Sequence, residues 1–373
     1  MKIRAKGIEV VRGQSRATRY LRRVWGRTPV FLFVLGGTAT AFIPGITVAG
    51  ANPDLVRYTP AADAELIQHG ECRSITGVPA TPDGKPTPAM ISQTAIRRAK
   101  IPFVFIDAGT YVKPLVPYVS TGLPSPGGDI RTGRALSLTD VMSLLEIGKE
   151  VGENFSQMTN FVVIGESIPG GTTTALGVLL ALGIDARGKV SSSMPNNPHE
   201  IKNKAVAKGM KKADIAIGGF KSKPYEALAA MGDPILATVS GIATGALPRA
   251  EVILAGGTQM AAVAALLSAM KISLRNLAVA TTPYIIADKS SDLEWLMGKI
   301  EPRVPLFTAD PGLEHSSKPG LRAFSEGFVK EGVGAGGAAF SAMVKTRGRI
   351  TPTRLRSGIE AAYKTVVEER IRR

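Results

Sequence analysis

Short apolar runs recur along the chain, and a stretch with helical character follows each of them. Runs of this kind cover residues 30–35, 101–106, 161–164, 215–217, 251–254 and 277–280. Strands that are apolar without alternation are typical of a parallel sheet with helices on both faces. The pattern therefore predicts an α/β fold with a doubly wound, mostly parallel sheet, and a small helical subdomain built from the chain ends.

Several helix boundaries can be predicted from the residue types. Thr59 and Pro60 resemble a helix start with proline in the first turn, and Ser137 with Asp140 resembles a capping box for a helix that continues to about residue 150. Residues 172–182 are apolar nearly all round, which predicts a buried helix. Residues 76–88 and 120–135 are rich in proline and glycine, and long loops of this type often belong to functional sites.

Positive charge is concentrated at the two ends of the chain. The 46 basic and 30 acidic residues give a net charge of +16. Residues 1–28 hold nine basic side chains and one acidic one, and residues 345–373 hold nine basic and three acidic ones. We expect a basic N-terminal arm (residues 1–28), an α/β domain (29–345) and a basic C-terminal helix (346–373). Nucleic acid is not an expected partner, because the body of the chain is almost neutral.

An uncharged stretch at residues 28–53 follows Arg22 and Arg23 and superficially resembles an export signal. Its strongly apolar part, residues 30–35, is too short to cross a bilayer. Because Gly36 and Gly37 follow this apolar run, it fits a buried strand better than an export signal. We therefore predict a cytoplasmic protein that does not interact with membranes.

Metal and disulfide chemistry have little support in the sequence. The single cysteine, Cys72, has no partner within the chain, and the three histidines (His69, His199 and His315) lack ligand spacing. We predict neither a metal nor a cofactor. The chemistry must then depend on carboxylates, hydroxyls, amides and backbone N–H groups.

A glycine- and threonine-rich segment at residues 165–174 follows one predicted strand and opens a predicted helix. This is the placement of an anion site, because free N–H groups and the helix dipole both favour negative charge. The lysine of a nucleotide-triphosphate loop is absent, so the segment fits a single phosphate better than ATP or GTP. An ordinary turn with glycines for packing is the alternative. The candidate residues are Gly165, Glu166, Ser167, Gly170, Gly171, Thr172 and Thr173.

Two later segments could complete such a site. Gly256, Gly257 and Thr258 follow another predicted strand and offer a second set of donors. Glu331 lies among the glycines of residues 332–337, where a partly desolvated carboxylate could serve as a general base. A surface acid at a helix end is an equally good interpretation of Glu331 from these residues alone. The spacing of Gly332, Gly334 and Gly337 matches a dinucleotide motif formally, but no clear strand precedes it.

Together, residues 165–173, 256–262 and 330–335 resemble segments of the nicotinate-nucleotide:5,6-dimethylbenzimidazole phosphoribosyltransferase family of cobalamin biosynthesis. Residues 44–51, 58–65 and 82–89 resemble its archaeal branch. The resemblance implies that Glu331 is the catalytic base, and it adds Lys202 or Lys204 and His315 as further candidates. Asp107, Gly332 and Gly334 complete the candidate set. The chain departs from the bacterial pattern in having Gly171 in place of asparagine and Lys330 in place of glycine.

The resemblance also implies a reaction. In it, 5-phosphoribosyl passes from nicotinate mononucleotide to 5,6-dimethylbenzimidazole or a similar lower-ligand base, during assembly of the cobamide nucleotide loop. The products are an α-riboside 5′-phosphate and nicotinate. The expected partners are therefore the mononucleotide, an aromatic base and a second copy of the chain in a homodimer. Dimethylbenzimidazole, adenine and phenolic bases stay open as acceptors. The alternatives are a phosphoribosyltransferase with another acceptor and a non-catalytic nucleotide- or nucleic-acid-binding α/β protein.

Overall fold

The fold is taken from a computed structural model that describes residues 5–50, 52–75, 85–123 and 125–369. Residues 76–84 of the expected proline- and glycine-rich loop lie outside the described residues. The same is true of residues 1–4 and 370–373 at the basic ends.

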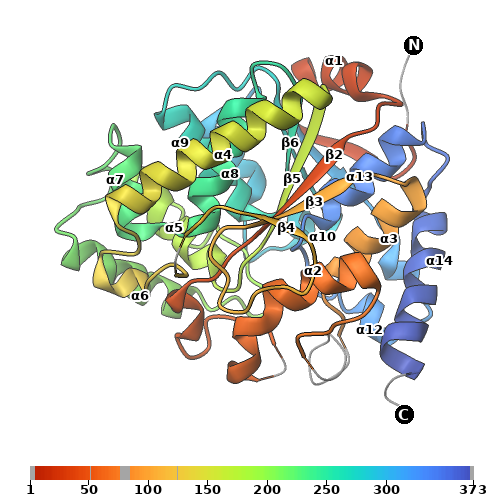
Figure 1. The fold of residues 1–373 in the computed structure, drawn as a ribbon, viewed down its shortest axis with the longest axis horizontal. Coiled ribbons are helices and arrows are strands. Elements are labelled where there is room, and N and C mark those ends of the chain that lie inside the picture. Colours follow the sequence, from red (N-terminus) through yellow and green to blue (C-terminus); the bar gives the residue numbers. More distant parts are fainter. Residues whose placement is uncertain (1–4, 51, 76–84, 124, 370–373) are drawn as a thin grey trace.

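In the described part of the chain, eight strands form a single sheet with the order β1-β8-β7-β6-β5-β2-β3-β4 (Figure 1). Neighbouring strands run parallel, except that β1 is antiparallel to β8. The strands are β1 (Ile8–Arg12), β2 (Val30–Leu35), β3 (Phe103–Asp107), β4 (Tyr118–Ser120), β5 (Phe161–Ser167), β6 (Glu251–Ala255), β7 (Leu277–Thr281) and β8 (Leu306–Ala309). The predicted α/β fold with a mostly parallel sheet is confirmed. Chain order reverses between β2 and β5, and ligands of open α/β sheets bind beside such a reversal, at the carboxyl ends of the strands.

Helices cover both faces of this sheet (Figure 1). Their bounds in the described residues are α1 (Gln14–Val24), α2 (Thr59–His69), α3 (Ala89–Ala99), α4 (Leu138–Met158), α5 (Gly171–Ala181), α6 (His199–Lys212), α7 (Pro224–Met231), α8 (Pro234–Ala246), α9 (Thr258–Ala269), α10 (Pro283–Ala287), α11 (Leu293–Ile300), α12 (Pro319–Arg322), α13 (Ala335–Lys345) and α14 (Pro352–Tyr363). Short 3-10 or π turns cover Ala39–Phe42, Pro53–Tyr58, Ile130–Thr132, Leu313–His315 and Lys364–Glu368. The Ser137 hydroxyl accepts a hydrogen bond from the backbone N–H of Asp140, as expected for the start of α4.

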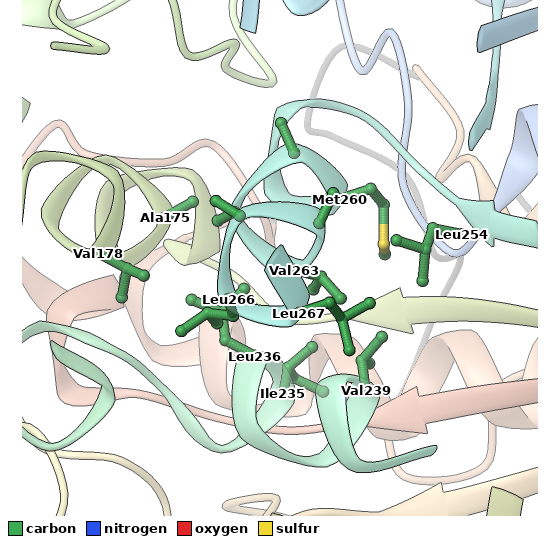
Figure 2. Packing of buried hydrophobic residues seen from close by; sticks show 14 of the residues in the cluster. Ala175, Val178, Ile235, Leu236, Val239, Leu254, Met260, Val263, Leu266 and Leu267 are labelled. Carbon is green, nitrogen blue, oxygen red and sulfur yellow. The ribbon is translucent and has the colours of Figure 1, made fainter. Parts of the chain in front are cut away.

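One face of the sheet is covered by α4, α5, α8 and α9, whose apolar side chains form a continuous core. Figure 2 shows Val263 and Leu266 of α9 beside Leu236 and Val239 of α8. Because α5 and α9 are buried nearly all round, their positions are fixed by packing on several sides. This fixes where their N-termini lie.

The other face is covered by α2, α3 and α13, and helices from both chain ends join this layer. In α1, Tyr20 is buried, and its hydroxyl donates to the carbonyl of Val252 at 2.8 Å. In α14, Leu355 and Ile359 are fully buried. Residues 8–24 of the expected basic arm therefore supply a strand and a helix to the folded body.

One predicted strand is wrong. Residues 215–217 lie in a turn, where the N–H groups of Gly218 and Phe220 bond to the carbonyls of Leu180 and Ala181 at the end of α5. The residues that follow this apolar stretch therefore cap a buried helix. The sequence analysis also missed the strands at both edges of the sheet.

The uncharged stretch that resembles an export signal contains β2, which lies in the interior of the sheet between β3 and β5. Residues Phe31–Leu35 have no exposed surface. Across the described residues, no helix combines the length and the apolar character that crossing a membrane requires.

Candidate active site

A cavity of about 200 Å³ opens at the carboxyl ends of β5, β6 and β7. The turns after these strands supply part of its wall, with residues 166–172, 257–259 and Ile285. The remaining sides are closed by residues 46–50, Leu55, Ile75, the start of α2, residues 85–88, residues 191–193, Val329 and residues 331–333. Both the glycine- and threonine-rich segment and Glu331 therefore line one cavity.

Two helices begin at this cavity. Helix α5 starts at Gly171, after Gly170 in the left-handed conformation (φ 80°), and no side chain caps its N-terminus. Helix α9 starts at Thr258, after Gly257, and is also uncapped by a side chain. All four residues line the cavity. Two helix dipoles and their free N–H groups thus create an anion-binding wall.

Glu331 lines the same cavity at the end of β7, and a β-carbon at Gly257 would come within 3.8 Å of its Cγ. Its carboxylate accepts hydrogen bonds from the backbone N–H of Thr282 at 2.8 Å and from that of Gly336 at 3.2 Å. The hydroxyl of Thr281 donates to it as well, at 3.2 Å. Burial raises the pKa of Glu331 to about 7, although these hydrogen bonds lower it in part. A carboxylate with this pKa is suited to accept a proton near neutral pH.

The glycines after Glu331 allow the start of α13 to lie directly on the sheet. A β-carbon at Gly334 would come within 3.1 Å of the Gly165 α-carbon, and one at Gly336 would come within 2.0 Å of the Thr281 carbonyl carbon. The backbone N–H of Val333 also donates to the carbonyl of Glu166 at 2.9 Å. These contacts hold Glu331 and the β5–α5 turn together. The match to a dinucleotide motif is therefore explained by packing.

Glu166 is a second buried carboxylate in the cavity wall. Burial, together with the negative charges of Asp233, Glu331 and Asp63, raises its pKa to about 8. Glu166 therefore holds a proton at neutral pH. In that state it adds no negative charge to the wall that faces the anion site.

Two buried lysines support the wall at residues 191–193. Lys202 donates to the carbonyl of Ser191 at 2.5 Å, and Lys330 donates to the carbonyl of Met194 at 3.0 Å. Lys330 also forms a buried ion pair with Asp288 at 3.0 Å. Because the lysines bind the carbonyls of this segment, its backbone is fixed while Ser191, like Ser192 and Ser193, lines the cavity.

A family described as "Phosphoribosyltransferase" matches residues 88–284, more than half of the chain. The chain belongs to this family. It is 47% identical to the UPF0284 protein of Archaeoglobus fulgidus over 90% of this chain and 94% of the relative. It is also 44% identical to the UPF0284 protein of Methanothermobacter thermautotrophicus over 87% of this chain and 90% of the relative. The archaeal branch expected from the sequence is confirmed.

The fold is shared with solved structures of more distant proteins. One is the nicotinate-nucleotide-dimethylbenzimidazole phosphoribosyltransferase of Thermus thermophilus, with a TM-score of 0.59 and 16% identity over 92% of this chain and 93% of that one. A second structure, of CobT from the same organism, gives a TM-score of 0.57 and 16% identity over 89% of this chain and 91% of that one. At 16% identity, the likeness to these two structures shows a shared fold only.

Most of the candidate residues lie on the cavity wall. Those that line it are Glu166, Ser167, Gly170, Gly171, Thr172, Gly257, Thr258, Glu331 and Gly332. Gly165, Thr173, Gly256 and Gly334 lie next to this wall in the chain without lining it. Lys202 lies behind the wall at residues 191–193.

Three further candidates and one loop lie away from the cavity. Asp107, at the end of β3, binds the N–H groups of Gly109 and Thr110 in its own turn. Lys204 and His315 have side chains that are 76% and 69% exposed and pair with Glu200 and Glu314, their near neighbours in the chain. Of the two expected site loops, residues 85–88 line the cavity, whereas the described residues of 120–135 do not.

Sequence reasoning missed several residues of the wall, namely Asp63, Thr87, Gln259 and Ser191–Ser193. Asp63 could have been recognised from the sequence as a candidate site residue, because it is the single acidic residue in the otherwise apolar first half of α2. The part of the chain that the structure describes holds no group of three or more His, Cys, Asp or Glu side chains that could bind a metal ion.

Proposed function

We propose that the chain transfers a 5-phosphoribosyl group from nicotinate mononucleotide to an aromatic base and releases nicotinate. One observation carries the proposal: two uncapped helix N-termini and the carboxylate of Glu331 share a single cavity. Membership in a phosphoribosyltransferase family supports it. So does the likeness in fold to a protein whose name states this reaction.

The 5′-phosphate of the mononucleotide would bind at the N-termini of α5 and α9. Main-chain N–H groups and two helix dipoles suit a single phosphate, and no lysine of the described residues lines this part of the wall. Binding energy from the phosphate would hold the anomeric carbon in place for attack, although the phosphate itself does not react.

Glu331 would act as the general base. One ring nitrogen of the acceptor attacks the anomeric carbon as the bond to nicotinate breaks. The electron pair of that bond stays on nicotinate, whose pyridinium nitrogen becomes neutral. Glu331 takes the proton from the second ring nitrogen. Attack from the side opposite to the leaving group inverts the carbon and gives an α-riboside 5′-phosphate.

The test is incubation of the full chain with nicotinate mononucleotide and a panel of bases, namely dimethylbenzimidazole, adenine and p-cresol. Chromatography should show free nicotinate and an equal amount of a new ribotide, and NMR should show the α configuration. Absence of both products with every base would reject the proposal. A role in cobamide nucleotide-loop assembly requires that a lower-ligand base is accepted.

The pH dependence of turnover should report the ionisation of Glu331. Its pKa is raised to about 7, so the fraction in the proton-accepting form increases as the pH rises. We therefore expect kcat to rise between about pH 6 and pH 8 and to approach a plateau above it, with a midpoint near 7. The second pKa of a phosphate lies near 6, so substrate ionisation should affect KM in the same range and kcat must be measured at saturation. A kcat that is flat across this range would contradict the assignment of the base.

A further inference from the structure

Positively charged side chains gather at the end of the sheet that lies opposite to the cavity. Parallel strands begin at one edge of a sheet and end at the other, and the cavity lies at the edge where they end. Arg27 precedes the start of β2, Lys100 that of β3 and Arg275 that of β7. All three residues are exposed. They therefore lie at the edge of the sheet away from the cavity.

The two basic ends of the chain meet at this edge. The backbone N–H of Gly26, just after α1, donates to the carbonyl of Val344 in α13 at 3.0 Å. A β-carbon at Gly26 would collide with Nε of Arg347, so this arginine lies directly against the turn. Lys345 donates to the carbonyl of Lys100 at 2.6 Å. Folding thus brings together positive charges that lie near opposite ends of the chain.

Seven exposed cations make up what we call the basic face, namely Arg22, Arg27, Lys100, Arg275, Arg347, Arg349 and Arg354. The start of α14 joins it because Arg354 donates to the carbonyl of Arg349 at 2.8 Å. Within the described residues, none of the seven forms an ion pair with an acidic side chain. Arg131, Arg187 and Arg303, on other parts of the surface, each pair with a carboxylate. Unpaired like charges at one place create a positive potential that favours an anionic partner.

Glu251, at the start of β6, lies among these cations but does not neutralise them. Its carboxylate pairs with Arg23 at 2.8 Å. Burial raises the pKa of Glu251 to about 7, although the positive charges of Arg23, Arg27 and Arg275 lower it in part. This carboxyl group is therefore only partly ionised at neutral pH, and the basic face keeps most of its positive charge.

The residue types indicate phosphate as the anion. Six of the seven cations are arginines, whose planar guanidinium can bind a phosphate through two N–H groups. Because the seven come from α1, the starts of the strands and the segment between α13 and α14, one ligand that contacts most of them must carry several phosphates.

The structure also separates the polyanions that could supply these phosphates. A helix that lies in a lipid surface buries its apolar face in the lipid. In α1 the apolar residues Ala17, Tyr20, Leu21 and Val24 are already buried in the protein. A single-stranded nucleic acid stacks its bases on aromatic rings. Exposed aromatic rings of the described residues lie on other segments, at Phe42, Tyr111, Tyr118 and Tyr225.

We propose that the basic face binds the phosphate backbone of a nucleic-acid duplex without reading its sequence. Contacts of this kind depend on charge and supply most of the affinity in sequence-independent binding. The near neutrality of the body of the chain does not oppose this binding, because both basic ends lie on one face. A duplex bound there leaves the cavity open, so the inference does not depend on the transferase function.

The test is the fluorescence anisotropy of a labelled DNA duplex of mixed sequence, titrated with the full chain at several salt concentrations. Each phosphate that the protein neutralises contributes about −0.9 to the slope of log K against log salt. We expect contacts to about four phosphates, so binding should weaken about 10²-fold between about 50 mM and 200 mM salt. Vesicles of phosphatidylglycerol and phosphatidylcholine are the comparison for a lipid surface.

A triple variant tests whether the basic face carries this binding. Arg27→Gln, Arg347→Gln and Arg349→Gln together should raise Kd at least about ten-fold at low salt and make the slope shallower by about three. The matched control removes the same charge by changing Lys208, Lys211 and Lys212 to glutamine. These exposed lysines lie on α6, far from α1 (Figure 1), and the control should bind the duplex like the wild type.

Three results would overturn the inference. The first is a wild-type chain that does not bind the duplex at low salt, or that binds the anionic vesicles and not the duplex. The second is a triple arginine variant that binds the duplex as tightly as the wild type. The third is an equal loss in the lysine control, which would mean that net charge and not the basic face determines binding. An unchanged unfolding midpoint of both variants shows that they are folded.

Discussion

Replacing Glu331 with glutamine should lower kcat by about 10²–10⁴-fold, the usual effect of losing a general base. The amide has the same size, and its oxygen can still accept from the N–H of Thr282, but its NH2 group replaces the oxygen that accepts from the N–H groups of Gly332 and Gly336, so the fold of the variant must be checked. The amide cannot take a proton from the attacking base. The Kd for nicotinate mononucleotide should change little, because the phosphate is expected to bind the main-chain N–H groups at the starts of α5 and α9 and not the Glu331 side chain.

The measurement is nicotinate release at saturating substrates, together with calorimetric binding of the mononucleotide. A conversion of Glu326 to glutamine is the matched control, because Glu326 is exposed, near in sequence and absent from the cavity wall. Its kcat should equal that of the wild type. An unfolding midpoint close to the wild-type value would show that Glu331→Gln is folded. A kcat within a few-fold of wild type would reject the role of Glu331 as base.

The interior strands could be predicted from the sequence because they are buried on both faces. Strands β2, β5 and β6 are continuous apolar runs, and every described residue of β5 and β6 is buried. The edge strands gave no such signal. Strand β4 has three exposed residues, and β1 mixes polar and apolar positions. The apolar residues 215–217 were assigned to a strand because periodicity alone does not separate a short strand from an apolar turn, and in the structure Ile217 is exposed.

Site residues could be predicted only where the residue types of one short segment indicate a function by themselves. Glycines before a helix indicate an anion site, and a lone glutamate among glycines indicates an unusual carboxylate. Asp63, Ser167 and Thr87 come together only through the packing of α2 and residues 85–88 against the end of β5. The choice between Lys202 and Lys204 also needed the structure, since helix geometry places the two on different faces without saying which face is buried.

The second large effect is expected from Gly171→Val at the start of α5. A β-carbon at this position would lie 2.2 Å from the amide nitrogen of Gln259 and 2.7 Å from Cγ2 of Ile168. Gln259 belongs to the first turn of α9, so valine must displace the Gln259 and Ile168 side chains that lie between the two helix starts of the anion-binding wall. We expect KM for nicotinate mononucleotide to rise at least about ten-fold, a loss of about 1.4 kcal/mol or more in binding.

The acceptor provides the internal control for Gly171→Val, because the base is expected to contact Glu331 at the end of β7, whereas the substituted position lies in the β5–α5 turn. Its KM should therefore change much less than that of the mononucleotide. Gly171→Ala should give a smaller effect in the same direction, since the methyl group meets the same two side chains but extends less far. Overpacking typically costs about 1–3 kcal/mol, so the free energy of unfolding of each variant should be measured as well. A folded valine variant with an unchanged KM for the mononucleotide would show that the phosphate does not bind at the β5–α5 turn. The phosphate would then have to be assigned to another part of the cavity wall, and the position of the anomeric carbon relative to Glu331 would change with it.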